Sequence, residues 1–275
     1  MSRFSNGPVT VEQLTTDLGL SQNHLYDFAF GGATTGLGDL RDGGTQTKVG
    51  ASGLPGMLLQ VTGTLSSVAP IAPTSLFLVW GGVNDFRQQP PGSGSPAIAV
   101  SDILTIVAEL QGAGAEHILV PGMPDLSLTP AYYGDAAAQA FSQTFNSLLV
   151  GSLPAGVTYF DTYDFMHAIV ADPAAYGLTN VTAPCLVGTT PCPDPNQYLF
   201  WDSMHPTTAA DAIWAAQLEK AAVPDPPYTH HAERRNRGTR RCVAKKDFGV
   251  VFGLTRELQD KKGHVRCVPL LLLSG

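Results

Sequence analysis

The feature that most constrains this fold is a regular alternation of short apolar segments and amphipathic stretches. Each apolar segment has the length of a strand and ends in turn-forming residues. The four predicted strands are Tyr26–Phe30, Ser75–Trp80, His117–Val120 and Val157–Phe160. Strands separated by helices indicate βαβ units, and hence a parallel sheet with right-handed crossovers.

The stretches between these strands have helical spacing of their apolar residues. The predicted helices are Val9–Leu20, Leu54–Val68, Ala97–Ala113, Tyr132–Leu153, Tyr163–Ala171 and Thr207–Ala222. In an open α/β sheet the ligand binds beyond the carboxyl ends of the strands. Gly31-Gly32 and Gly82-Val83-Asn84-Asp85 follow the first two strands directly. We therefore expect the functional site at that edge of the sheet.

Charge divides the chain into two parts. Up to residue 229 there are 5 Lys and Arg against 19 Asp and Glu, and from His230 onward there are 11 against 4. The composition changes at Val223-Pro224-Asp225-Pro226-Pro227. We interpret residues 1–223 as one domain and residues 224–275 as a basic, unstructured tail. An acidic body with so few cations does not indicate nucleic-acid binding.

The chain contains no apolar run of transmembrane length and does not open with a signal peptide. Cys185 and Cys192 lie in one Gly/Pro loop. They are either a short-loop disulfide, which would indicate an oxidising compartment, or two free thiols, and the sequence leaves both readings open.

His24, His117 and His167 have no partners at metal-ligand spacing, so we expect no metal and no organic cofactor.

Asp202-Ser203-Met204-His205-Pro206 combines a carboxylate and an imidazole three residues apart. In a turn, Asp202 can accept a hydrogen bond from Nδ1–H of His205, which leaves Nε2 as a general base. Pro206 suits the start of the following helix. By itself this spacing also fits a surface histidine with a satisfied hydrogen bond.

Two further segments carry groups that could stabilise an oxyanion. Asn84 follows a buried strand, where its amide can donate into the crevice, although an Asx-turn is the simpler interpretation of this residue alone. The backbone N–H of Gly32, or alternatively of Gly31, could supply a second donor, although a plain tight turn explains the double glycine equally well.

Together, these segments resemble the SGNH (GDSL) hydrolases, in particular the bacterial branch of phospholipase-, lecithinase- and hemolysin-like esterases. The resemblance covers Arg3 to about Val223 and rests on Arg3–Gly7, Phe28–Thr35, Gly82–Asp85, and Leu199 to Pro206. It implies a flavodoxin-like three-layer α/β/α sandwich. It also implies that His205 is the general base, Asp202 its orienting acid, and Asn84 and Gly32 the oxyanion donors.

The first motif of that family, which carries the serine nucleophile after the first strand, has no counterpart here. Gly38-Asp39-Leu40 and Gly134-Asp135-Ala136 lack the serine, Ser5 falls downstream of the expected position, and Ser203 lies between acid and base. The resemblance places the missing strand in the centre of the sheet, between Tyr26–Phe30 and Ser75–Trp80. We therefore interpret the chain as a fragment of a longer protein, with a frameshift or junction after Pro226 as a further hypothesis.

The sequence therefore favours a carboxylic ester hydrolase acting on a small-molecule or lipid acyl ester. Trp80, Phe86 and Trp201 are candidates for the acyl pocket, although core packing would also explain them. An acyltransferase and an inactive, pocket-bearing binding protein are the alternatives. We expect a monomer that binds no nucleic acid. The resemblance implies secretion of the complete protein, and the absent serine predicts that this chain alone is inactive.

Overall fold

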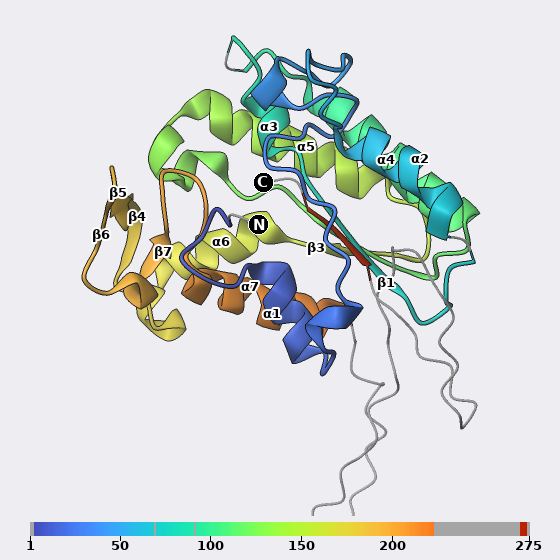
Figure 1. Cartoon of the computed structure of the whole chain (residues 1–275). Helices are drawn as coiled ribbons and strands as arrows, with labels where there is room; N and C mark the ends of the chain where they lie inside the picture. Colours follow the sequence, from blue (N-terminus) through green and yellow to red (C-terminus); the bar gives the residue numbers. More distant parts are fainter. Residues whose placement is uncertain (1–2, 69, 91, 223–269, 274–275) are drawn as a thin grey trace, which may run out of the picture.

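A computed structural model describes residues 3–68, 70–90, 92–222 and 270–273 of the chain. Its centre is a parallel sheet of order β3-β2-β1-β8 (Figure 1). The strands are β1 (Leu76–Trp80), β2 (His117–Pro121), β3 (Val157–Phe160) and β8 (Leu270–Leu273). The first three correspond closely to segments that the sequence predicts. The mixed α/β architecture with a parallel sheet is confirmed.

Helices cover both faces of this sheet, which gives three layers (Figure 1). One face carries α2 (Met57–Val68), α4 (Pro96–Gly112) and α5 (Ala136–Ser152). The other carries α1 (Thr10–Asp17), α6 (Thr162–Ala171) and α7 (Thr208–Ala222), with α1 packed on α7. A one-turn helix, α3 (Val83–Phe86), follows β1 directly. These two layers of helices leave β1 and β2 buried on both faces.

β1 and β2 are largely apolar because both faces of the sheet are covered there, whereas β3 contains the exposed Thr158. Phe77, Leu78 and Leu119 are at most 1% exposed, and they form one core with residues of α4 and α5. Some helices begin at other residues than the sequence predicts, because a capping side chain sets the first turn. For example, α5 begins only after Asp135, whose carboxylate accepts the N–H groups of Ala137 and Ala138 as an N-cap.

The predicted strand Tyr26–Phe30 does not form, and this expectation is wrong for the chain as folded. Of its residues only Asp27 has bridge geometry, and the rest are irregular. A strand requires a ladder of hydrogen bonds to a neighbour. Leu270–Leu273 instead pair with Phe77–Trp80, on the side of β1 away from β2. The C-terminal segment thus lies beside β1, where the family resemblance places the missing strand.

The tail prediction for residues 224–275 lies mostly outside the described residues. Where the structure does describe that segment, at Leu270–Leu273, it is a strand. Sequence patterning gave no reason to expect it to pair with β1, because residues distant in the chain are brought together only by the tertiary structure.

A small peripheral region precedes α7. β4 (Asn180–Pro184) pairs with β7 (Tyr198–Phe200), and β5 (Leu186–Val187) pairs with β6 (Thr190–Pro191). Cys185 and Cys192 form a disulfide across the β5–β6 turn, which decides the alternative that the sequence left open. This region ends at Phe200, so it leads the chain into the Asp202–Pro206 turn.

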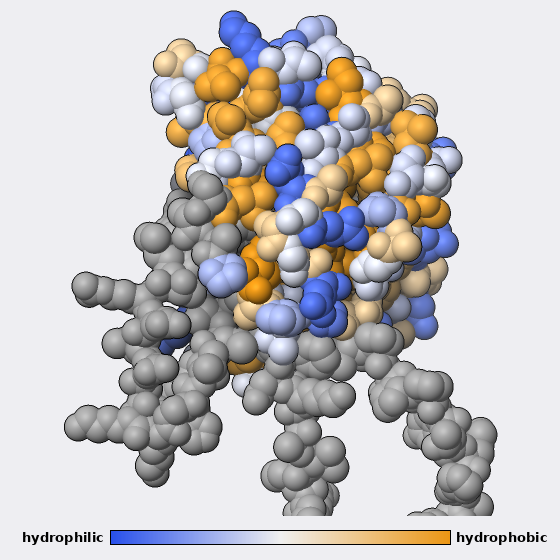
Figure 2. All heavy atoms as spheres, turned by 90° about the vertical axis from the view of Figure 1, so that its right-hand side faces the viewer, coloured by the Kyte–Doolittle hydropathy of each residue, from blue (hydrophilic) through white to orange (hydrophobic). Residues whose placement is uncertain are grey.

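The outer surface over α2 and α4 mixes polar and apolar residues (Figure 2). Within the described part of the chain, no helix combines the length and the apolar character that crossing a membrane requires.

Candidate active site

The turn between β7 and α7 holds the predicted histidine and aspartate in contact. Nδ1 of His205 lies 2.8 Å from Oδ2 and 3.0 Å from Oδ1 of Asp202. Oδ1 also accepts the backbone N–H groups of Met204 and His205, both at 2.8 Å. These bonds hold the carboxylate and the ring in one orientation. Nε2 of His205 makes no hydrogen bond to the residues that the structure describes.

The hydrogen bonds also set the charge of Asp202. Its partial burial works to raise the pKa of the carboxyl group, while the His205 ring and the backbone N–H groups of His205 and Met204 lower it. The hydrogen bonds prevail, and the pKa of Asp202 lies below its usual value. An ionised carboxylate stabilises the imidazolium that forms when a histidine accepts a proton.

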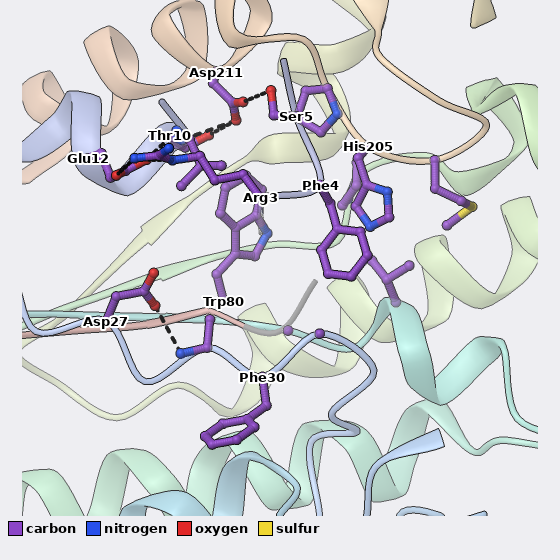
Figure 3. A pocket seen from close by; sticks show the side chains of 18 of the residues that line it. Arg3, Phe4, Ser5, Thr10, Glu12, Asp27, Phe30, Trp80, His205 and Asp211 are labelled. Carbon is purple, nitrogen blue, oxygen red and sulfur yellow. Dashed lines mark hydrogen bonds and ion pairs between the residues drawn. The ribbon is translucent and has the colours of Figure 1, made fainter. Parts of the chain in front are cut away.

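His205 borders a pocket of about 990 Å³ (Figure 3). Its lining combines apolar walls with charged groups from the N-terminal segment, the loop before Ala33, the end of β1 and the start of α7. The lining residues are Arg3, Phe4, Ser5, Val9, Thr10, Glu12, Asp27, Phe28, Ala29, Phe30, Gly31, Arg41, Trp80, Gly81, Val83, Arg87, Pro124, Met204, His205, Pro206 and Asp211.

Phe4 forms one wall directly against the histidine. Its ring stacks on the His205 imidazole with centroids 4.7 Å apart and planes inclined by 18° (Figure 3). The same ring lies so close to Gly31 that a Cβ atom there would overlap it. Gly31 is therefore required by close approach, and the stack fixes which face of His205 remains open.

The double glycine forms a tight turn at the pocket edge. Gly32 has φ of +98°, a conformation that favours glycine, and a side chain there would collide with the Asp39 carboxylate. Gly31 lines the pocket, whereas Gly32 does not. The structure thus brings the Gly31–Gly32 turn and His205 to one cavity, with Gly31 the more accessible of the two.

Asn84 lies beside the Gly31–Gly32 turn, but its side-chain amide already forms hydrogen bonds within the protein. Nδ2 donates to the carbonyl oxygen of Ala33 at 3.0 Å, and Oδ1 accepts from Arg87 at 3.1 Å. The side chain is fully buried and does not line the pocket. An amide nitrogen carries two hydrogens. A role as an oxyanion donor would therefore use the hydrogen that does not bond to Ala33, or would exchange the Ala33 contact for the oxyanion.

The three aromatic residues expected in the acyl pocket lie in different environments. Trp80 lines the pocket, and its Nε1 donates to the carbonyl oxygen of Gly122 at 3.1 Å. Phe86 is only 3% exposed and packs edge to face on Tyr132 and Phe141. The structure thus places Phe86 in the core. Trp201 is partly exposed and does not line this pocket.

Ser5 lies in the pocket, but its hydroxyl is turned away from His205. Oγ of Ser5 donates to Asp211 at 3.1 Å (Figure 3). Asp211 also accepts from the backbone and hydroxyl of Thr10, at 3.1 and 2.6 Å. Burial raises the pKa of Asp211 to about 7. The Ser5 hydroxyl thus bonds to α7 through Asp211, which also binds Thr10 at the start of α1, rather than completing a serine–histidine pair.

A second histidine–aspartate pair lies outside this pocket. Nε2 of His167 lies 2.9 Å from Oδ2 of Asp125, and the His167 ring packs on Tyr163. Asp125 also accepts the hydroxyl of Ser127 at 2.6 Å. Among the described residues, no group of three His, Cys, Asp or Glu side chains is arranged to hold a metal ion.

Sequence reasoning overlooked two arginines of this site. Arg41 and Arg87 line the pocket from segments between and after the recognised motifs. Residues 1–229 contain few Lys and Arg. This scarcity is the sequence signal that could have marked each arginine of the domain as a candidate site residue.

The chain is similar in sequence to proteins of one known family. The family model "GDSL-like Lipase/Acylhydrolase" matches residues 1–218. A GDSL esterase/lipase from Arabidopsis thaliana is 27% identical, over 78% of this chain and 76% of that protein. An uncharacterized protein of the trpE-trpG intergenic region of Pseudomonas putida is 30% identical, over 84% of this chain and 44% of that protein.

Esterase EstA of Pseudomonas aeruginosa is 33% identical, over 52% of this chain and 25% of that protein. The chain thus spans about three quarters of the Arabidopsis relative but less than half of the two Pseudomonas proteins. The family match covers most of the chain, including the His205 turn and the double glycine. The chain therefore belongs to the GDSL-like lipase/acylhydrolase family.

Proposed function

We propose that this domain hydrolyses carboxylic acyl esters, with His205 as general base and Asp202 as its orienting acid. The observation that carries the proposal is the hydrogen-bonded pair of these residues at the edge of a pocket with apolar walls. Fixing Nδ1 on a carboxylate leaves Nε2 to exchange protons with a nucleophile. Backbone N–H of Gly32, or of Gly31, together with Asn84 would donate to the oxyanion.

In the proposed reaction a serine hydroxyl adds to the ester carbonyl carbon while Nε2 of His205 takes its proton. The tetrahedral intermediate then collapses, the alcohol leaves with that proton, and an acyl-serine remains. Water, deprotonated by the same nitrogen, releases the acid and restores the serine. Neither Ser5, which is bonded to Asp211, nor Ser203, between acid and base, suits this step. The proposal assigns the nucleophile to neither of them.

The first test is hydrolysis of p-nitrophenyl butyrate by the purified chain and by His205→Ala. We expect no difference between them, because the proposal assigns the nucleophile to neither Ser5 nor Ser203. A clear rate of hydrolysis that depends on His205 would contradict the inference that this chain lacks a nucleophile, and it would support ester hydrolysis.

The second test supplies the missing group. The chain is extended at its N-terminus with an apolar strand followed by Gly-Asp-Ser, and the same ester is added. We expect hydrolysis that is lost in His205→Ala and in the extension with alanine in place of serine. A folded, extended chain whose activity does not depend on His205 would overturn the proposal.

A further inference from the structure

The ring of Phe4 touches two separate turns of the His205 pocket. It stacks on the His205 imidazole, with ring centroids 4.7 Å apart. It also packs so closely on Gly31 that a Cβ atom there would overlap it. Figure 3 shows the ring between His205 and the loop that carries Phe30. Phe4 therefore bridges the turn that holds the histidine and the turn that holds the double glycine.

The proposed reaction requires these same two turns to act on one carbonyl group. A general base works within about 2.6–3.2 Å of the group whose proton it takes. Oxyanion donors work at about 2.7–3.1 Å from the developing charge. The nucleophile and the carbonyl group must therefore lie between His205 and the Gly31–Gly32 turn. In this structure that space holds the Phe4 ring.

The segment that carries Phe4 is held by few contacts. Phe4 is 47% exposed, so much of its side chain faces solvent rather than the core. Within the described part of the chain, Arg3–Asn6 form no backbone–backbone hydrogen bond. Arg3 is instead tied to α1 by a bidentate pair with Glu12. Segments with few buried apolar contacts open at a low cost in free energy.

Two further side chains hold the segment just after Phe4. Ser5 donates to the carboxylate of Asp211 in α7 at 3.1 Å. Oδ1 of Asn6 accepts the backbone N–H of Thr208 at 2.8 Å, at the start of the same helix. Asp211 is only 3% exposed, so water competes little for its bond to Ser5. These bonds fasten the segment to α7 and thereby set the position of Phe4.

We propose that Phe4 is a gate of this pocket, whose ring closes the space between His205 and the Gly31–Gly32 turn. The bond between Ser5 and Asp211 keeps the gate closed, so Ser5 is a positioning residue that acts through Phe4. An ester opens the gate by displacing the ring, and its carbonyl group takes the place that the ring leaves. The role of the carbonyl group rests on the proposed esterase function, whereas the cover over His205 does not.

The test measures the chemical reactivity of His205 and needs no nucleophilic serine. Diethyl pyrocarbonate acylates the unprotonated nitrogen of a neutral imidazole, which is Nε2 where Asp202 holds the proton on Nδ1. Mass spectrometry of peptides gives the rate constant of modification for each histidine separately. His167, which pairs with Asp125 outside the pocket, serves as the internal reference.

Phe4→Ala should expose His205 to the reagent. We expect its rate constant to rise at least about tenfold, because a minor open state of the intact chain is populated to about 10% or less. The rate constant of His167 should not change. Phe4→Tyr keeps the ring and can direct its hydroxyl to solvent, so it should retain the slow rate of the wild type.

Phe30→Ala is the matched control for Phe4→Ala. Phe30 lines the same pocket and is 39% exposed, and Figure 3 shows its ring directed away from His205. This variant removes an aromatic ring of the same size from the same cavity. We expect the rate constant of His205 to stay at its wild-type value.

Ser5→Ala tests the bond that keeps the gate closed while the ring remains. We expect a rise at His205 of about two- to tenfold, the effect of one hydrogen bond on an equilibrium. Added to Phe4→Ala, the same change should produce no further rise, because Ser5 acts through the ring. An equal rise in both backgrounds would overturn this role of Ser5.

Equal rate constants of His205 in the wild type, Phe4→Ala and Phe30→Ala would overturn the gate. A rise at His205 that is matched at His167 would also overturn it, since it would report a general loosening of the fold. A gated His205 without hydrolysis by the extended chain would contradict only the proposed esterase activity. Hydrolysis without any effect of Phe4 on His205 would contradict only the gate.

Discussion

The carboxylate of Asp202 lies 2.8 Å from Nδ1 of His205 and leaves Nε2 without a described partner. Because a carboxylate only accepts hydrogen bonds, it holds the neutral ring in the form protonated on Nδ1. In Asp202→Asn the new amide can donate to Nδ1, so we expect the His205 proton to shift to Nε2. Long-range ¹H–¹⁵N NMR under mildly alkaline conditions distinguishes these tautomers.

His167, which pairs with Asp125 outside the pocket, provides the internal reference for that spectrum. Its tautomer should be the same in the wild type and in Asp202→Asn. An unchanged His205 tautomer in a folded Asp202→Asn variant would show that Asp202 does not orient the ring.

Asp85 should make the domain less stable as pH rises. Its carboxylate is fully buried and accepts the N–H and the hydroxyl of Thr35, and burial raises its pKa from 3.8 to about 7. Between these values the folded state binds more protons than the unfolded state, so the free energy of unfolding falls as pH rises through this window. At about 1.4 kcal/mol per pKa unit, the contribution of Asp85 is on the order of 4 kcal/mol.

Asp85→Asn removes this titration while keeping an oxygen that Thr35 can donate to. Urea denaturation at about pH 4 and about pH 7 should therefore show a smaller pH-dependent loss in Asp85→Asn than in the wild type. Asp135→Asn is the matched control, because asparagine also serves as an N-cap at that exposed position. An equal loss in all three proteins would contradict the buried proton on Asp85.

The strand β8 should contribute to the stability of β1. Leu270–Leu273 pair with Phe77–Trp80, and proline removes the ladder N–H of the residue it replaces. Since alternate residues of a strand direct their N–H groups to the same neighbour, either Leu271→Pro or Leu272→Pro should lose a bond to β1. We expect that variant to lower the urea midpoint and the hydrogen-exchange protection of residues 77–79.

Leu271→Val and Leu272→Val serve as controls, since valine suits a strand and keeps its N–H. If both proline variants match these controls in midpoint and protection, β8 does not contribute to the sheet in solution.

The Cys185–Cys192 disulfide closes a short loop and should stabilise the β5–β6 turn. The chain-entropy relation gives about 2.5 kcal/mol for a loop of this size. Reductant should lower the free energy of unfolding of the wild type by roughly that amount. The Cys185→Ala/Cys192→Ala double variant should start lower and not respond. A wild type that is insensitive to reductant while its thiols titrate as free would contradict this prediction.

Much of the scaffold could be predicted from local patterns. β1 and β2 are apolar and mostly buried because both faces of the sheet are covered, and their sequences report that burial directly, whereas β3 is only partly buried. The contact between Asp202 and His205 could also be predicted, because three residues in a turn suffice to join them. The strand predicted at Tyr26–Phe30 failed because apolar alternation reports burial and does not identify a ladder partner.

The sequence alone determined the α/β class and the His205–Asp202 contact, since each depends on residues close together in the chain. Only the tertiary structure decided that β8 lies beside β1, that Phe4 covers one face of His205, and that Phe86 is buried. Only it joined Cys185 to Cys192 and brought Arg41 and Arg87 to one pocket. These contacts depend on which surfaces pack together, and the local periodicity of a chain does not encode that choice.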